Sequence, residues 1–168
     1  MKKIFTLVIA AMLTVAFAHA QTGWVTHQGD NRISVKFPSA PVEQIPGSFM
    51  AAAKDSSVAC VLTIVDFVKV AGIDSIALAP IKNTPEFAAQ LKTGMGSSLP
   101  NVQLEDFKIG TWKGFTSYTS SGVDPQMKRY DIFMLIIGNK LYSLSTVTRN
   151  GGSLEGRDTF WKSIQLSN

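Results

Sequence analysis

The chain has 168 residues, with 16 Lys and Arg against 12 Asp and Glu, a formal net charge of +4 at pH 7. Beyond the N-terminal Lys2-Lys3 the longest basic run is Lys128-Arg129, so no nucleic-acid-binding surface is expected. One cysteine and two histidines exclude an intrachain disulfide and a four-ligand zinc site of His and Cys side chains.

The first twenty residues predict a secretory signal peptide. Lys2 and Lys3 form a positive n-region, residues 4–17 are almost uncharged and apolar, and Ala18-His19-Ala20 has the small-x-small pattern of a cleavage site. An apolar run of this length is too short to span about 30 Å of hydrocarbon. We therefore expect cleavage near Ala20, no stable membrane insertion afterwards, and a periplasmic or secreted protein. No cysteine follows the cleavage site, so a lipid anchor is not expected.

Residues 21–168 are expected to form one globular domain that begins with strands. Trp24–Gln28 and Ile33–Phe37 predict two strands around a Gly-Asp-Asn turn. In the second strand Ile33, Val35 and Phe37 share one face, and Pro38 has no amide hydrogen with which to continue a central ladder, so pairing ends there or lies at an edge.

Two further strands are predicted at residues 49–53 and 57–67. The second is apolar and β-branched (VACVLTIVDF), so it is expected in the middle of a sheet with both faces covered. Cys60 lies within it, where a free cysteine behaves as a small buried hydrophobe; a reactive or intermolecular thiol is the alternative.

A helix is predicted from residue 84, after a connection at residues 70–82 that has no clear period. Thr84 can cap it, Pro85 suits the first helical position, and Phe87, Leu91 and Met95 recur on one face. Gly94 and Gly96 are expected to end this helix.

The second half of the chain predicts an antiparallel meander closed by a second helix. Gly138-Asn139 is a two-residue hairpin turn, and Ser153 is a candidate helix cap. The expected strands are 102–109, 112–121, 126–137 and 140–149, and the helix is 153–163. The fold class is therefore α+β, a mainly antiparallel sheet with two helices packed on it.

The search for catalytic chemistry yields no constellation. No G-x-S-x-G elbow is present, and Gly151-Gly152-Ser153 before the second helix is interpreted as a hairpin exit and cap, with anion binding as the alternative. Glu105 and Asp106 are adjacent on one predicted strand, so their side chains point to opposite faces and cannot act on one bond together.

The remaining titratable groups have structural interpretations. His27 is expected to be a partly exposed bystander on the first strand. Asp66 is expected to mark the emergence of its strand into solvent, and Arg129 and Asp131 to form an exposed ion pair. We therefore expect no enzyme, no cofactor and no metal.

Trp112 and Tyr118 are the candidate interaction residues. If 112–121 is one strand, the two side chains share a face, while Phe115 points to the other face. At least one of these faces is expected to be core. If the Trp112 and Tyr118 face is exposed, it is a candidate surface for a protein or a glycan.

Several of these segments, in this order, resemble the PsbP-like group of small α/β sandwiches. The resemblance rests on Phe37-Pro38-x-x-Pro41 after a strand, the Gly138–Tyr142 hairpin (GNKLY), and the closing segment Arg157–Ile164 (RDTFWKSI). It implies a PsbP-like α/β/α sandwich and a non-catalytic module that docks onto larger partners. It assigns no binding residue, because the matching stretches are structural.

The functional expectation is an exported, non-catalytic binding or accessory module that contacts another envelope or secreted protein. The alternative is a periplasmic carrier of a small hydrophobic or glycan ligand, held between sheet and helix.

Overall fold

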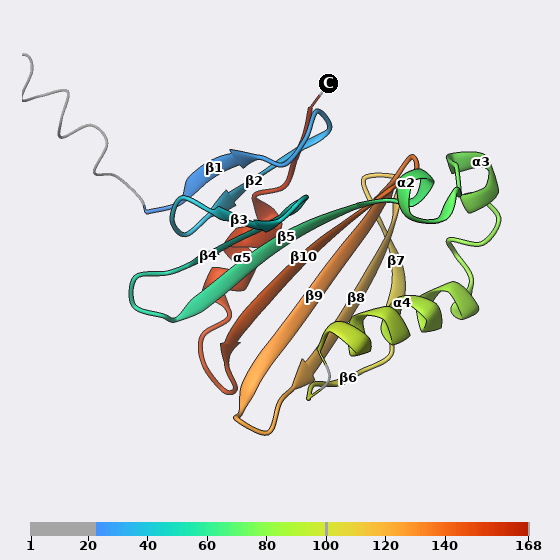
Figure 1. Cartoon of the computed structure of the whole chain (residues 1–168). Coiled ribbons are helices and arrows are strands. Elements are labelled where there is room, and N and C mark those ends of the chain that lie inside the picture. Colours follow the sequence, from blue (N-terminus) through green and yellow to red (C-terminus); the bar gives the residue numbers. More distant parts are fainter. Residues whose placement is uncertain (1–22, 100, 168) are drawn as a thin grey trace, which may run out of the picture.

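The computed structural model describes residues 23–99 and 101–167, and the fold is built on two β-sheets (Figure 1). The predicted signal peptide, residues 1–20, lies outside the described residues and stays a prediction. No helix in the described part of the chain is long and apolar enough to cross a membrane.

The larger sheet has eight strands, and each of its strand pairs is antiparallel, as predicted. Its order is β3 (Val42–Ile45), β4 (Ser48–Ala52), β5 (Val58–Asp66), β10 (Lys140–Arg149), β9 (Lys128–Ile137), β8 (Phe115–Val123) and β6 (Gln103–Leu104), and β7 (Lys108–Trp112) also pairs with β8. The sheet therefore runs from a hairpin edge at β3 to a second edge formed by β6 and β7.

The smaller sheet has the order β1 (Val25–Gln28), β2 (Ile33–Phe37) and β11 (Gln165–Leu166). The alternation predicted for β2 is confirmed, because Ile33, Val35 and Phe37 are fully buried. Ser34, on the other face, is buried as well, although Lys36 on that face is exposed; β2 is the middle strand of this sheet. Pairing ends at Phe37, directly before Pro38, as expected of a residue without an amide hydrogen.

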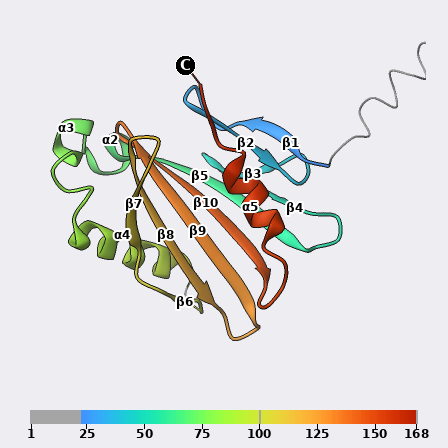
Figure 2. The same cartoon turned by 180° about the vertical axis from the view of Figure 1, so that it is seen from behind.

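Helices cover both faces of the larger sheet. On one side α5 (Glu155–Lys162) packs together with the smaller sheet, and on the other lie α2 (Phe67–Ala71), α3 (Ser75–Leu78) and α4 (Pro85–Ser98) (Figures 1 and 2). The two predicted helices are α4 and α5, so the α+β sandwich is confirmed. The two short helices α2 and α3 occupy the segment predicted as an irregular connection.

Strand β9, inside the larger sheet, contributes side chains to both hydrophobic cores, because successive side chains point to opposite faces of the sheet. Phe133 and Leu135 belong to the core on the α5 side, while Ile132 and Met134 belong to the core on the α4 side. An uninterrupted apolar run is required here because both faces of the strand are covered.

The start of α4 is as predicted, and its end is not. The Thr84 hydroxyl accepts a hydrogen bond from the amide of Phe87 at 3.2 Å, and Pro85 is the first helical residue. The helix runs on through Gly94 and Gly96 to Ser98, so the prediction that these glycines end it was wrong. Each mid-helix glycine costs up to about 1 kcal/mol relative to Ala, which the helix tolerates.

Two tight turns define the meander. At Gly138-Asn139 only the glycine has positive φ (+63°), the pattern of a type II′ hairpin. A second two-residue hairpin lies at Lys113-Gly114, where both residues have positive φ (+47° and +83°), the pattern of type I′. The predicted strand 112–121 is therefore wrong: Trp112 ends β7, and β8 begins at Phe115.

Strand β5 is fully covered on one face and only partly covered on the other, which corrects the prediction that both its faces are covered. Val58, Cys60 and Leu62 are buried on the α5 side. On the other side Val61 and Thr63 are half-buried, since α4 contacts β6 and β7 at the opposite part of the sheet.

Candidate functional site

The two sequence-predicted interaction residues, Trp112 and Tyr118, do not share a surface. Trp112 is half-buried against the core on the α5 side. Tyr118 is fully buried in the core on the α4 side, where its hydroxyl donates to the carbonyl of Lys82 and burial raises its pKa to about 12. The Lys113-Gly114 turn changes the strand between them, so the predicted joint patch was wrong.

Asp131 is a buried group and not half of an exposed ion pair. Its side chain is 3% exposed and accepts hydrogen bonds from Nε and Nη2 of Arg129 at 2.8–3.0 Å. Nη1 of Arg157 on α5 lies 3.6 Å away. The expectation of an exposed pair was wrong because α5 packs over this end of β9, and the charge is neutralised by both guanidinium groups.

His27 is half-buried beside two aromatic residues of the core on the α5 side, so its predicted partial exposure is confirmed, and Cys60 lies within that core. The His27 ring lies 5.8 Å from Phe37 and 4.4 Å from Phe49, and burial lowers its pKa while nearby Glu43 partly offsets that shift. Cys60 is fully buried, as predicted, and burial raises the pKa of its thiol to about 12. Among the residues that the structure describes, no group of three His, Cys, Asp or Glu side chains could hold a metal ion.

The most exposed apolar segment of the described chain is residues 67–81 (FVKVAGIDSIALAPI), which we call the apolar lobe. It comprises α2, α3 and the turns that flank α3, and its only charged residues are Lys69 and Asp74. Its exposed apolar residues are Val68, Val70, Ala71, Ile76, Ala77, Ala79, Pro80 and Ile81. Ile76 is 81% exposed and Val70 67%. Exposed apolar residues concentrated in this way are typical of interaction sites.

Short polar caps give the apolar lobe its shape. The Asp66 carboxylate accepts from the amide of Val68, and Gly72 ends α2 with φ +67°. The Asp74 carboxylate accepts from the amides of Ile76 and Ala77 at 3.0 and 2.9 Å and starts α3. Asp66 was expected only to mark the emergence of β5; it also begins the next element.

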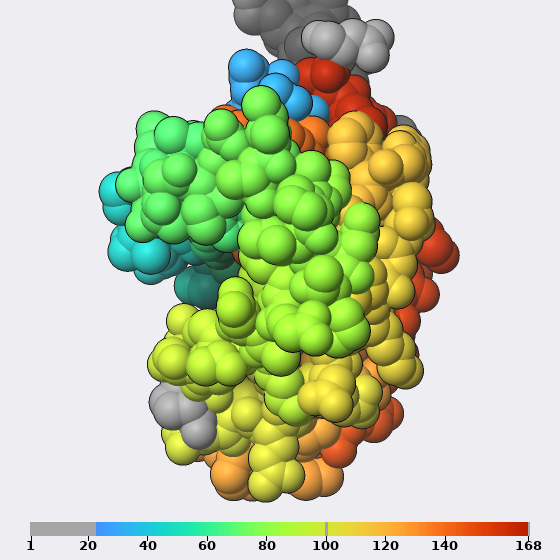
Figure 3. Space-filling view, turned by 90° about the vertical axis from the view of Figure 1, so that its right-hand side faces the viewer, coloured from blue at the N-terminus to red at the C-terminus, as the bar shows by residue number. Residues whose placement is uncertain are grey.

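Leu78 is the most deeply buried side chain of the apolar lobe. Leu78 is 0% exposed and belongs to the core on the α4 side, against which Phe67 and Ile73 also pack. The remaining aliphatic side chains face outward. Figure 3 looks onto this side of the molecule, where α2 and α3 (green) stand at one end above α4 (yellow-green).

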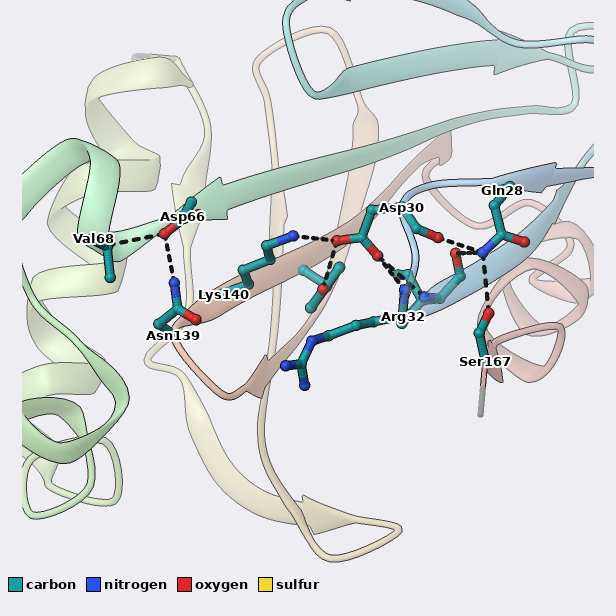
Figure 4. A network of polar contacts seen from close by, with 10 residues as sticks. Gln28, Asp30, Arg32, Asp66, Val68, Asn139, Lys140 and Ser167 are labelled. Atoms are coloured by element: carbon teal, nitrogen blue, oxygen red, sulfur yellow. Dashed lines mark hydrogen bonds and ion pairs between the residues drawn. The ribbon is translucent and has the colours of Figure 1, made fainter.

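A polar network supports the base of the apolar lobe (Figure 4). The side-chain amide of Asn139, at the tip of the β9–β10 hairpin, donates to the Asp66 carboxylate at 2.6 Å. In addition, the backbone amide of Phe67 donates to the carbonyl of Asn139 at 2.9 Å. The hairpin tip thus holds the first residues of α2.

The same hairpin connects the two sheets. Oδ2 of Asp30, in the β1–β2 turn, accepts from Nζ of Lys140 at 2.8 Å and from the hydroxyl of Tyr142 at 2.9 Å (Figure 4). Burial alone would raise the pKa of the Asp30 carboxyl. The hydrogen bonds from Lys140, from the backbone amide of Arg32 and from Tyr142 outweigh burial and hold the pKa below its usual value. Burial and the Asp30 carboxylate together raise the pKa of Tyr142.

A second exposed apolar set lies on the β3–β4 edge, at Val42, Ile45 and Met50. This edge has devices that discourage strand addition: β3 has only four residues, its register is irregular between Glu43 and Ile45, and Glu43 is charged. The apolar lobe is built of short helices, and its exposed apolar residues lie close together in sequence, between positions 68 and 81, so it is the candidate functional site.

Comparison with known proteins places the fold. No family model matches the sequence, and no curated protein matches it. The structure is similar to that of cyanobacterial PsbP (CyanoP) from Synechocystis sp. PCC 6803, with a TM-score of 0.60 and 13% identity over 86% of this chain and 93% of that one. It is also similar to a crystal structure from Bacteroides thetaiotaomicron VPI-5482, with a TM-score of 0.54 and 14% identity over 88% of this chain. The chain spans 49% of that Bacteroides protein.

The protein therefore has a PsbP-like fold, as the sequence resemblance implied. At these identities the likeness concerns the fold alone, and function has to be argued from the apolar lobe.

Proposed function

We propose that the protein is an exported, non-catalytic binding module that docks onto another envelope or secreted protein through the apolar lobe. The observation that carries this proposal is the exposure of eight apolar residues between positions 68 and 81, with one Lys and one Asp among them.

The shape of the apolar lobe supports docking. Its two helices are capped by Asp66 and Asp74, and Leu78 is anchored in the core, so the outward residues are held in place before a partner arrives. Preorganisation lowers the entropy lost on binding. The side chains that a partner would cover are short and branched (Val68, Val70, Ile76), and each loses little rotamer freedom on burial.

The test is site-specific photocrosslinking in the native host. A photoreactive residue replaces Ile76 in one variant and Met127 in the other; Met127 is 58% exposed and lies in the β8–β9 turn, outside the apolar lobe. We expect one discrete crosslinked protein from position 76 and none from position 127.

A double substitution completes the test. Val70→Asp with Ile76→Asp places two carboxylates on the apolar lobe, and both sites are exposed, so folding measured by circular dichroism is expected to be unchanged. Crosslinking from a third lobe position, Ala79, is then expected to disappear. If it persists, or if positions 76 and 127 give the same products, the apolar lobe is not the docking surface.

Export is part of the same proposal. The mature protein is expected in the periplasmic or extracellular fraction with Gln21 as its first residue, which N-terminal sequencing of the purified protein tests. A protein recovered from the cytoplasm with Met1 retained would contradict it.

A further inference from the structure

A cleft of about 820 Å³ lies on the face of the larger sheet opposite the apolar lobe. Its walls come from four segments far apart in sequence: residues 23–25, 38–39, 53–58 and 153–159. Figure 2 shows α5 between β1, β2 and the connection from β4 to β5, where these segments meet. A volume of this size is typical of sites for small organic ligands.

The deeper wall of the cleft is apolar. Its less exposed lining includes the half-buried Trp24 and Pro38 and the buried Val58. Gly156 allows α5 to approach β5, because a Cβ there would lie 2.6 Å from Cγ1 of Val58. The indole of Trp24 is the one aromatic ring in this lining.

The mouth of the cleft is polar and carries more negative than positive charge. Its exposed lining has one ammonium group, Lys54, and two carboxylates, Asp55 and Glu155. Hydroxyl groups of Ser57 and Ser153 lie beside them. An anionic ligand would meet two carboxylates at the entrance, so phosphate and sulfate groups are disfavoured.

The lining has few of the large aliphatic side chains that usually hold acyl chains. It contains no Leu, Ile, Phe or Met, and its only aliphatic side chains besides Pro38 and Ala53 are Val25 and Val58. A sugar ring has the opposite requirements, since its C–H face packs on an indole and its hydroxyls hydrogen-bond to carboxylates and hydroxyls. We infer that this cleft binds a neutral carbohydrate, with one ring against Trp24 and hydroxyl groups directed at Asp55 and Glu155.

This inference is independent of the docking proposal, because no residue of the apolar lobe lines the cleft. The alternative function considered from the sequence was a carrier of a small hydrophobic or glycan ligand. The inference places the ligand of such a carrier in this cleft and favours a glycan over a hydrophobic molecule.

The test titrates the ¹⁵N-labelled full chain with cellobiose, maltotriose and N,N′-diacetylchitobiose, each to about 10 mM, a range that detects even millimolar affinity. At least one sugar is expected to shift the Trp24 indole signal and the amides of Ser57, Ser153 and Gly156. Sodium laurate, titrated in parallel below its micelle concentration, is expected to leave these signals unchanged.

Matched variants separate binding from folding. Trp24→Ala is expected to weaken binding about tenfold or more, whereas Trp112→Ala, at a half-buried tryptophan outside the cleft, retains it. Because Trp24 also packs on the core, the exposed pair Asp55→Asn with Glu155→Gln serves as the second variant, and it too is expected to bind more weakly.

Three outcomes would overturn the inference: no shifts with any of the three sugars, shifts confined to residues outside the cleft, or shifts at the cleft with laurate alone. Val70→Asp with Ile76→Asp is expected to bind the sugar normally. The carbohydrate proposal and the docking proposal can therefore be refuted independently of each other.

Discussion

Replacing Leu78 with Ala tests how much this buried side chain contributes to anchoring the apolar lobe, beside the half-buried Phe67 and Ile73. Leu78 is 0% exposed in the core on the α4 side, and the substitution removes three carbon atoms. At about 0.8 kcal/mol per buried methylene, the transfer loss is about 2.4 kcal/mol. The cavity adds to this, and Leu→Ala substitutions in cores cost roughly 2–5 kcal/mol in all. We expect the free energy of unfolding to fall by about 3 kcal/mol, in the lower part of that range. The apolar lobe lies at the surface, so its residues can move to fill part of the cavity.

Urea unfolding followed by circular dichroism measures this loss, with Ile76→Ala as the control. Ile76 lies two residues away in the same short helix and is 81% exposed, so its truncation is expected to change the free energy of unfolding by no more than about 0.5 kcal/mol. Hydrogen exchange should also accelerate across residues 67–81 in Leu78→Ala. A loss below about 1 kcal/mol, or equal losses in the two variants, would refute the anchoring role.

Two further predictions concern the space around two glycines and the pH dependence of stability. Gly122→Ala is expected to cost roughly 1–3 kcal/mol in urea unfolding, because its Cβ would lie 2.6 Å from the carbonyl oxygen of Gln103. Gly94→Ala in α4 meets no atom within 4 Å and is expected to stabilise by roughly 0.5–1 kcal/mol; the opposite order of the two variants would refute this. The pKa of the Asp30 carboxyl is lower in the folded protein than the usual aspartate value of about 3.9. The ionised carboxylate therefore stabilises the folded state at pH values above about 3.9, and this stabilisation is lost as the pH falls through the lower pKa of the folded protein. Asp30→Asn should therefore melt below the wild type at pH 7, and thermal melts should show that gap narrowing toward pH 2; a constant gap would contradict the assignment.

Local patterns predicted most of the elements, for reasons that act over a few residues. The cap at Thr84, the alternation in Ile33–Phe37 and the glycine turn at 138 are each decided by neighbouring atoms, and each is confirmed. The turn at Lys113 was missed because lysine seldom adopts positive φ, so nothing in its identity indicates a hairpin. Strand β11 has two residues and forms only by pairing with β2, which lies far away in sequence.

The candidate site was not predicted, because exposure is a property of the assembled chain. Residues 67–81 read as an apolar connection without a period, and such a segment is equally compatible with burial. The small number of charged residues in this segment was the feature of the sequence that could have indicated an apolar interaction site. The structure buries Leu78 alone in α3 and leaves Ile76 outside.

The sequence by itself determined the α+β class, the start of α4 at the Thr84 cap, the turn at Gly138, the alternation in Ile33–Phe37, and the absence of a four-ligand His/Cys zinc site. The tertiary structure decided which apolar residues face water. It separated Trp112 from Tyr118, covered Asp131 with α5, and left most of residues 67–81 exposed. The physical reason is that the hydrophobic free energy depends on how much apolar surface is removed from water. Elements that are distant in sequence decide, by how they pack, which side chains lose their contact with water.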